Sequence, residues 1–391
     1  MKISSDKEMR PYFVSPLFDS LFVCGGAVWI LFAMSLSVSS QTSNSHQMQL
    51  LYQISALGAI FFSACHSLAT PVLEAVENFS SGKSSFKSSL CSSCKPGLGS
   101  LFALIIVAAT ILSLDVWLRL PLIAVLCKYY LLLVPYHFLF QIKGIFLIYC
   151  RRGGFPLDPH RRRQLDFLFH TTAFYWVAFL LSSGQQAGQT FLFQELPAWA
   201  LFSESFVDIL RLLVSVFAFC YCSRLLFRLG RKVNRVPWIA ILLLASGLAF
   251  FLLPIWCVKE LWLFVPSFFH GLQYLIVVNE RLKENLQEAL KDYSSFFYPV
   301  SLVLVLFLYG LPWLIFMGSG WKVIAALFVI FQLWHFHLDG HIWKKKKERL
   351  QNRSFKNFSA LSSLCESARN LRPGYPRAIF SHQAHLDRST D

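Results

Sequence analysis

The stretch LIAVLCKYYLLLVPYHFLFQIKGIFLIY, residues 122–149, carries only two charged side chains, Lys128 and Lys143. A helix that crosses the hydrocarbon core of a bilayer needs roughly 20 mainly apolar residues, because the core is about 30 Å thick and a helix rises about 1.5 Å per residue. The stretch meets both conditions. It predicts a membrane-spanning α-helix.

Similar apolar stretches run along the rest of the chain. They lie at 18–38, 51–75, 98–116, 165–183, 205–226, 237–256, 261–279, 298–318 and 321–343. The whole chain is 55% hydrophobic and 15% charged, with a mean hydropathy of +0.51. Soluble domains average about 45–50% apolar and about 25% charged residues. The fold class predicted is therefore all-α, a polytopic transmembrane helix bundle of ten spans.

The basic residues predict the orientation of these spans. If the N-terminus faces the cytoplasm and the loops alternate, 30 of the 36 Lys and Arg residues lie in cytoplasmic segments. The outside loops then hold only Arg119, Lys259 and Lys322. Cytoplasmic loops of membrane proteins carry just such an excess of Lys and Arg. We expect both termini in the cytoplasm.

The net charge of +15 follows the loops and does not form a patch on a folded domain. Membrane lipids, and not nucleic acid, are therefore the expected partners. The sequence does not predict an oligomeric state. Residues 1–343 form the expected transmembrane domain, and 344–391, which begin KKKKER, form a basic cytoplasmic tail that we expect to be partly disordered.

Several local features complete this outline. The serine-rich stretch 80–93 is expected to be a flexible loop, and Asp208 and Arg211, three residues apart, are expected to pair on one helix face. Lys128 and Lys143 lie toward opposite ends of their span and are expected to extend their ammonium groups to the interfaces. The first apolar stretch has no cleavage site after it, so we interpret it as an uncleaved span. No glycosylation sequon lies in an outside loop and no organellar signal is present, which favours a multi-pass protein of the bacterial inner membrane.

Four of the spans carry histidines at similar depth. His66, His137, His270 and His335 lie on the spans 51–75, 122–149, 261–279 and 321–343. All four spans run from outside to inside in this topology, and each histidine lies in the middle or the cytoplasmic half. One histidine in a span most often hydrogen-bonds a neighbouring helix, but four at matched depth favour a shared metal site.

Other polar residues share helix faces with these histidines. Gln141 lies four residues after His137, Gln273 and Tyr274 follow His270 by three and four, and Asp339 lies four residues after His335. Asp339 is expected to be a ligand with the histidines, because a carboxylate inside a span needs a partner or a cation. Gln141, Gln273 and Tyr274 are expected to orient ligands or contact bound oxygen. His337 is about 200° around the helix from His335, which makes it an outer residue of the metal site or an interface residue.

Imidazoles with a carboxylate suit iron, zinc and other transition metals. We expect one or two iron ions, because iron at such a centre keeps open positions where O₂ can bind. Zinc or another transition metal is the alternative.

The motif H…HxxxQ…HxxQY…HxxxDxxIW is carried by the four histidines with Gln141, Gln273, Tyr274, Asp339, Ile342 and Trp343. It resembles uncharacterised bacterial polytopic membrane proteins with scattered intramembrane histidines. It is more distantly similar to the Brp/Blh-type carotenoid-cleaving membrane oxygenases, and this similarity implies iron held by histidines of several spans.

The function expected is that of a membrane metalloenzyme, a non-haem iron oxidase or oxygenase acting on a lipophilic substrate. Phenylalanine is abundant, with 39 residues, and suits an apolar access path. Two alternatives stay open. The same histidines and Asp339 would bind protons or a cation in a transporter or channel, and a membrane acyltransferase would use a single catalytic histidine. The chain has no G-x-S-x-G, P-loop, G-x-G-x-x-G or H-E-x-x-H motif.

Overall fold

The computed structural model describes 12–39, 62, 65–67, 70, 86–155, 157–182, 190–191, 194–229, 237–253, 261–285, 299, 303 and 322–340 of the 391-residue chain. The chain divides into two units, residues 1–338 and 339–391, and only Asp339 and Gly340 of the second are described. The predicted spans 51–75 and 298–318 lie mostly outside the described residues, and the tail 344–391 lies wholly outside them.

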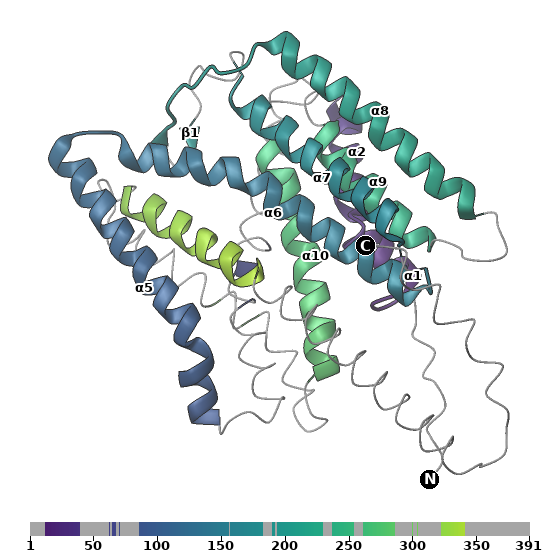
Figure 1. Ribbon diagram of the computed structural model, residues 1–391, viewed down its shortest axis with the longest axis horizontal. Helices are drawn as coiled ribbons and strands as arrows, with labels where there is room; N and C mark the ends of the chain where they lie inside the picture. Colours follow the sequence, from purple (N-terminus) through teal and green to yellow (C-terminus); the bar gives the residue numbers. More distant parts are fainter. Residues whose placement is uncertain are drawn as a thin grey trace, which may run out of the picture. The chain divides into compact units, whose positions relative to one another are not determined.

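The described part of the chain is mostly helical (Figure 1). The longer helices are α2 (Gly26–Ser39), α5 (Phe86–Leu118), α6 (Leu122–Arg152), α7 (Pro159–Leu180), α8 (Glu204–Leu229), α9 (Trp238–Leu252), α10 (Leu261–Asn285) and the unlabelled helix Lys322–Gly340. Between α7 and α8, β1 (Thr190–Phe191) pairs antiparallel with β2 (Gln194–Glu195), with Thr190 opposite Glu195.

Three of the described helices are long and apolar enough to cross a membrane. They are Leu122–Arg152, Glu204–Phe227 and Lys322–Gly340. Two shorter apolar helices, Phe102–Leu118 and Trp238–Leu252, accompany them. This agrees with a helical membrane protein, and each of these helices coincides with a predicted span.

The first predicted span is not one continuous helix. It consists of α1 (Pro16–Phe18), the π-helical turn η1 (Asp19–Val23) and α2, with Gly25 between the last two at φ +83°. A left-handed residue interrupts a helix, and glycine tolerates that conformation because it has no Cβ. Ser15 begins the segment, its hydroxyl accepting a hydrogen bond of 3.2 Å from the backbone N–H of Phe18.

The serine-rich stretch is helical from Phe86 onward, because α5 begins there. The prediction of a loop over 80–93 is therefore wrong for its second half. Serine is only mildly unfavourable inside a helix, and an existing helix adds residues more easily than it starts. The apolar part of α5 thus continues into the polar segment before it.

α6 is the central helix of the described part. It contacts α7 and α9 along much of its length and also meets α5 and α10 (Figure 1). α10 in turn contacts η1, α9 and α2. Pro135 lies inside α6 and cannot donate a backbone hydrogen bond, which membrane helices tolerate when neighbouring helices cover the break. The two helices that carry His137 and His270 are therefore packed together.

Segments predicted to face the same side of a membrane contact one another. On the predicted cytoplasmic side, the Arg152 guanidinium donates to the carbonyl of Tyr12 at 3.0 Å, and the indole N–H of Trp238 donates to the Tyr12 hydroxyl at 3.2 Å. On the predicted outer side, the buried carboxylate of Asp115 pairs with Lys322.

Three of the described cations on predicted spans have acidic or carbonyl partners. Arg211 and Asp208 form the expected ion pair at 3.4 Å, which confirms that prediction. Lys143 pairs with Asp166 on α7 at 2.5 Å. Lys128 is buried, and its ammonium donates to the carbonyl of Leu180 at 3.0 Å. A cation is favourable there because Leu180 ends α7, where helix carbonyls are unpaired. That Lys128 and Lys143 extend to membrane interfaces stays a prediction.

Candidate metal centre

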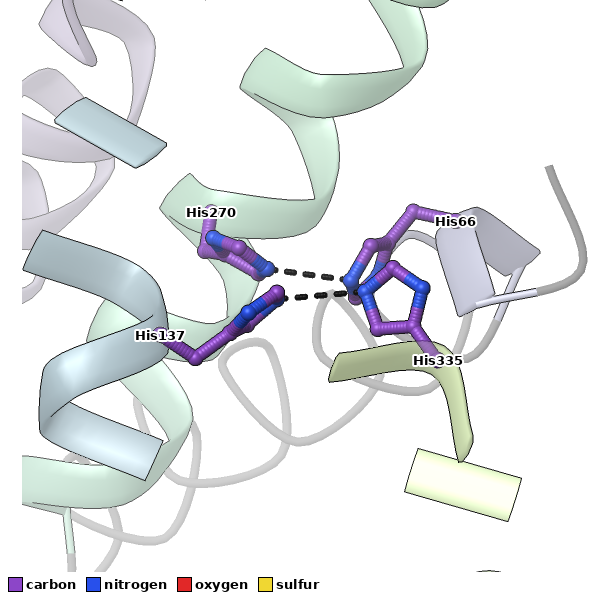
Figure 2. Close-up of side chains that lie close together, drawn as sticks. All are labelled: His66, His137, His270 and His335. Atoms are coloured by element: carbon purple, nitrogen blue, oxygen red, sulfur yellow. Dashed lines mark hydrogen bonds between the residues drawn. The ribbon is translucent and has the colours of Figure 1, made fainter. Parts of the chain in front are cut away.

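Four histidines from four segments meet inside the molecule. His137 lies on α6, His270 on α10, His335 on the helix Lys322–Gly340, and His66 on a short described helical stretch. One ring nitrogen of each lies within 4.8 Å of the corresponding nitrogen of every other (Figure 2). The convergence predicted from matched depth is confirmed for these four side chains.

The rings face one another as two pairs. The Nε2 atoms of His66 and His270 are 3.0 Å apart, and those of His137 and His335 are 3.1 Å apart (Figure 2). His66, His270 and His335 are 1%, 2% and 0% exposed, and His137 is partly buried. Polar rings removed from water in this way need partners, so the cluster has to be satisfied from within.

The facing nitrogens can be satisfied in two ways. Each N···N contact can hold one proton, donated by one ring and accepted by the other. Alternatively, all four nitrogens can present lone pairs to one metal ion. Metal–imidazole bonds of about 2.0–2.1 Å place neighbouring ligand nitrogens roughly 2.9–3.4 Å apart. The two close contacts fall within this range, and all four nitrogens lie within 4.8 Å of one another.

Phenylalanine rings cover two of the histidines. Phe138 stacks on the His270 ring, with centroids 4.0 Å apart and planes at 23°. Phe336 stacks on the His137 ring, also with centroids 4.0 Å apart and planes at 22°. Phe138 directly follows His137 on α6, and Phe336 directly follows His335 on the helix Lys322–Gly340, so each ring packs on a cluster histidine of a neighbouring helix. Such stacking restricts ring rotation and keeps water from these faces.

Thr70 connects the cluster to Tyr274. Its hydroxyl lies 2.8 Å from Nδ1 of His335 and 2.7 Å from the Tyr274 hydroxyl. A second hydrogen bond joins the segment of Thr70 to the helix of His335: the Ser67 hydroxyl donates to the Gln332 amide oxygen at 3.1 Å. Sequence reasoning missed Thr70. Its position four residues after His66, on the same helix face, was the available signal.

The two predicted glutamines form a chain behind His270. The Gln141 amide donates to the backbone carbonyl of His270 at 3.1 Å and to the Gln273 amide oxygen at 3.0 Å. Gln273 donates to the carbonyl of Val23 at 2.8 Å. These bonds fix the backbone at His270 and do not touch its ring. Contact of either glutamine with bound oxygen stays a prediction.

Two other predicted residues are not members of the group of four. Asp339 is buried, with 4% exposed, and His337 is exposed to solvent or lipid. The exposure of His337 follows from its position about 200° around the helix from His335. A role for either side chain as a ligand stays a prediction from sequence spacing.

Comparison with known proteins gave no relative. No family model matches the chain, and no curated protein or solved structure is significantly similar to it.

Proposed function

We propose that the protein is a multi-pass integral membrane metalloenzyme, a non-haem iron oxidase or oxygenase that uses O₂ on a lipophilic substrate. The observation that carries the proposal is the group of four histidines from four separate segments, with ligand nitrogens within 4.8 Å of one another. A packing role for one histidine is common, but four helical segments contributing one imidazole each to the same point is the arrangement of a bundle-core metal site.

The number of ligands favours iron over zinc for an enzyme. Zinc with four protein ligands is tetrahedral and closed, as in structural sites, whereas catalytic zinc keeps a water in the fourth position. Iron accepts six ligands, so four imidazoles leave two positions for O₂ and for substrate or water. Among the described residues, no carboxylate belongs to the group, so the ligand set is neutral and suits the ferrous ion.

The surroundings support a lipophilic substrate. His335 and His137 lie on helices apolar enough to cross a membrane, and phenylalanine rings stack directly on His137 and His270. These rings would give a bound metal apolar surroundings, which suit such a substrate. The bound metal would supply O₂ activation, and the protein would hold the imidazoles, exclude water and orient the substrate.

A ten-span topology with both termini in the cytoplasm of a bacterial inner membrane belongs to the same proposal. Its support is the alternation of Lys and Arg between loops and the contacts at the two helix ends. Tyr12, Arg152 and Trp238 meet at one end, and Asp115 and Lys322 at the other.

The test is metal content by elemental mass spectrometry on detergent-purified protein. Wild type should hold about one iron per chain, and His270→Ala and His335→Ala should each lose at least about 90% of it. His337→Ala is the matched control, because His337 is exposed on the helix that carries His335; it should keep its iron.

Nitric oxide then probes the open positions, since it binds ferrous iron in place of O₂ and gives a characteristic EPR signal. That signal is expected in wild type. Wild type without stoichiometric metal would refute the metal centre. One zinc per chain, with no signal after iron loading, would indicate a closed structural site.

The paired imidazoles give one specific reason for a second candidate, proton transport. The Nε2 contacts of 3.0 and 3.1 Å are hydrogen-bonded steps along which protons can move when no metal is present. Proton flux in proteoliposomes, measured with a chelator present and lost in His335→Ala, would favour this function. A single-histidine acyltransferase finds no support in a group of four.

A further inference from the structure

The Thr70 hydroxyl is enclosed between a cluster histidine and a phenol. It lies 2.8 Å from Nδ1 of His335 and 2.7 Å from the hydroxyl of Tyr274. Thr70, His335 and Tyr274 are 0%, 0% and 2% exposed and come from three different segments. No bulk water reaches these atoms, so the side chains themselves decide where the protons lie.

The two nitrogens of His335 have different neighbours. Nε2 faces His137 within the cluster (Figure 2). Nδ1 faces Thr70. A neutral imidazole carries its proton on one nitrogen and a lone pair on the other. If Nε2 is to bind a metal, Nδ1 must carry the proton and donate it to Thr70. Histidine ligands commonly make such a bond through the nitrogen away from the metal.

Thr70 can accept a hydrogen bond from His335 if the Tyr274 hydroxyl also donates to Thr70. A hydroxyl oxygen has two lone pairs, so Thr70 can accept from His335 and from the phenol, the more acidic of the two hydroxyls. The hydrogen of a helical threonine commonly points to the carbonyl four residues earlier, which here belongs to His66. Both lone pairs of the Thr70 oxygen then accept hydrogen bonds, and its one hydrogen is donated to a backbone carbonyl. Thr70 therefore has no hydrogen left to donate to His335.

His270 provides the contrast within the same cluster. Its Nδ1 is buried and has no hydrogen-bond partner among the residues that the structure describes. No described side chain therefore selects its tautomer through Nδ1, whereas Thr70 is in position to select that of His335 in this way. Of these two histidines, His335 has a described hydrogen-bond partner at Nδ1 and His270 does not.

We propose that Thr70, held by Tyr274, is a positioning residue that fixes His335 with the proton on Nδ1 and so presents the Nε2 lone pair to the metal centre. The proposal rests on the metal centre described under the proposed function. It gives Tyr274 an indirect role, acting through Thr70, and it links His66 and Thr70 of one segment to the ligand on another.

The test reads the tautomer directly, by ¹⁵N NMR of full-length, metal-free protein labelled at histidine. The His335 signals are assigned by their loss in His335→Gln. Wild type should show Nδ1 protonated and Nε2 unprotonated. Thr70→Val, which keeps the shape and removes the hydroxyl, should shift His335 toward the other tautomer. Thr70→Ser should restore the wild-type signals.

Cobalt(II) titration, followed by visible absorption, gives the second readout. Thr70→Val should bind cobalt about 10–100-fold more weakly, the usual loss when the outer partner of a histidine ligand is removed. Thr70→Ser should stay within about threefold of wild type, and Tyr274→Phe should lie between the two.

Wild-type His335 protonated on Nε2 would overturn the proposal, and this needs no variant to fold. Unchanged cobalt affinity in a well-folded Thr70→Val would overturn it as well. If wild type binds no metal but its tautomer depends on Thr70, the metal centre falls and the tautomer assignment stands. If wild type binds iron and the His335 tautomer is unchanged in Thr70→Val, the metal centre stands and the role proposed for Thr70 is wrong.

Discussion

At the scale of single residues, Gln273 completes a buried hydrogen-bond chain. It accepts from Gln141 at 3.0 Å and donates to the Val23 carbonyl at 2.8 Å, and it is 0% exposed. Replacing it by leucine leaves the Val23 carbonyl without this donor and removes an acceptor of Gln141. A buried polar group left without its partner costs about 1–3 kcal/mol. Gln273→Leu should therefore lower the thermal unfolding midpoint in detergent while keeping metal bound, because the hydrogen bonds described for the Gln273 side chain go to Gln141 and Val23 and not to an imidazole ring.

Gln164→Leu is the control for this change. The Gln164 amide contacts His160 at an exposed position, so the effect on stability should stay within about 0.5 kcal/mol. Equal midpoints for the two variants would mean that the buried chain adds no stability. If Gln273→Leu lost its metal but kept the wild-type unfolding midpoint, Gln273 would have a direct role at the metal centre.

The residue scale also shows what sequence reasoning can reach. The four histidines were identifiable because a polar side chain inside an apolar span stands out, and the charge pattern fixes its depth. Thr70 was not, because threonine is common in apolar spans and its role depends on which helix faces it. Whether a residue joins a cluster also depends on which way its helix is turned. Sequence spacing shows which residues share a face of one helix, but not which face of that helix meets a neighbouring helix.

At the scale of elements, Gly25 allows the first apolar segment to pass close to α9 and α10. Its φ is +83°, and a Cβ there would lie 2.8 Å from the rings of Phe250 and Phe269. The left-handed conformation alone costs a residue with a Cβ about 1–2 kcal/mol. Both rings are 1% exposed, and Phe269 directly precedes His270. Gly25→Ala should lower the unfolding midpoint and also reduce metal occupancy.

Gly144→Ala provides the comparison on α6. A Cβ at Gly144 meets nothing within 4 Å, and alanine is favoured over glycine in a helix by about 1 kcal/mol. This variant should be as stable as wild type or more so, with full metal content. A Gly25→Ala protein with wild-type midpoint and metal would show that the neighbouring rings move aside freely.

The sequence predicted where the apolar part of a helix lies better than where the helix begins. α7 begins at Pro159, before the predicted span 165–183, because the Asp158 carboxylate accepts from the N–H of Arg161 at 2.8 Å and so caps the helix in the polar segment. The break at Gly25 was not predicted, because hydropathy averages over a window and does not register one left-handed residue. The helical serine-rich segment was missed because composition describes solubility better than backbone conformation.

At the scale of the whole molecule, the charge pattern predicts topology and the structure adds contacts between loops. Arg152 follows the predicted fourth span, and Tyr12 precedes the first, yet the two are joined by a hydrogen bond of 3.0 Å. Lys322 and Asp115 form the corresponding contact at the opposite end. Loop charges alone do not predict which helices are neighbours, since Lys and Arg specify a side of the membrane and not a partner. Packing of α6 on α7, α9 and α10 therefore had to come from the structure.

The predicted topology requires an even number of spans, which reporter fusions can test. Alkaline phosphatase is active only where its disulfides form, on the periplasmic side, whereas GFP fluoresces in the cytoplasm. In a bacterial host, phosphatase fused after Asp391 should be inactive, and GFP at the same point should fluoresce. Phosphatase fused after Trp199, in the loop predicted to be outside, should be active. An active fusion after Asp391 would give an odd number of spans. It would also put the 11 Lys and Arg residues of 344–391 outside, against the positive-inside bias. The helix Lys322–Gly340 would then run in the opposite direction, which would change the predicted depth of His335.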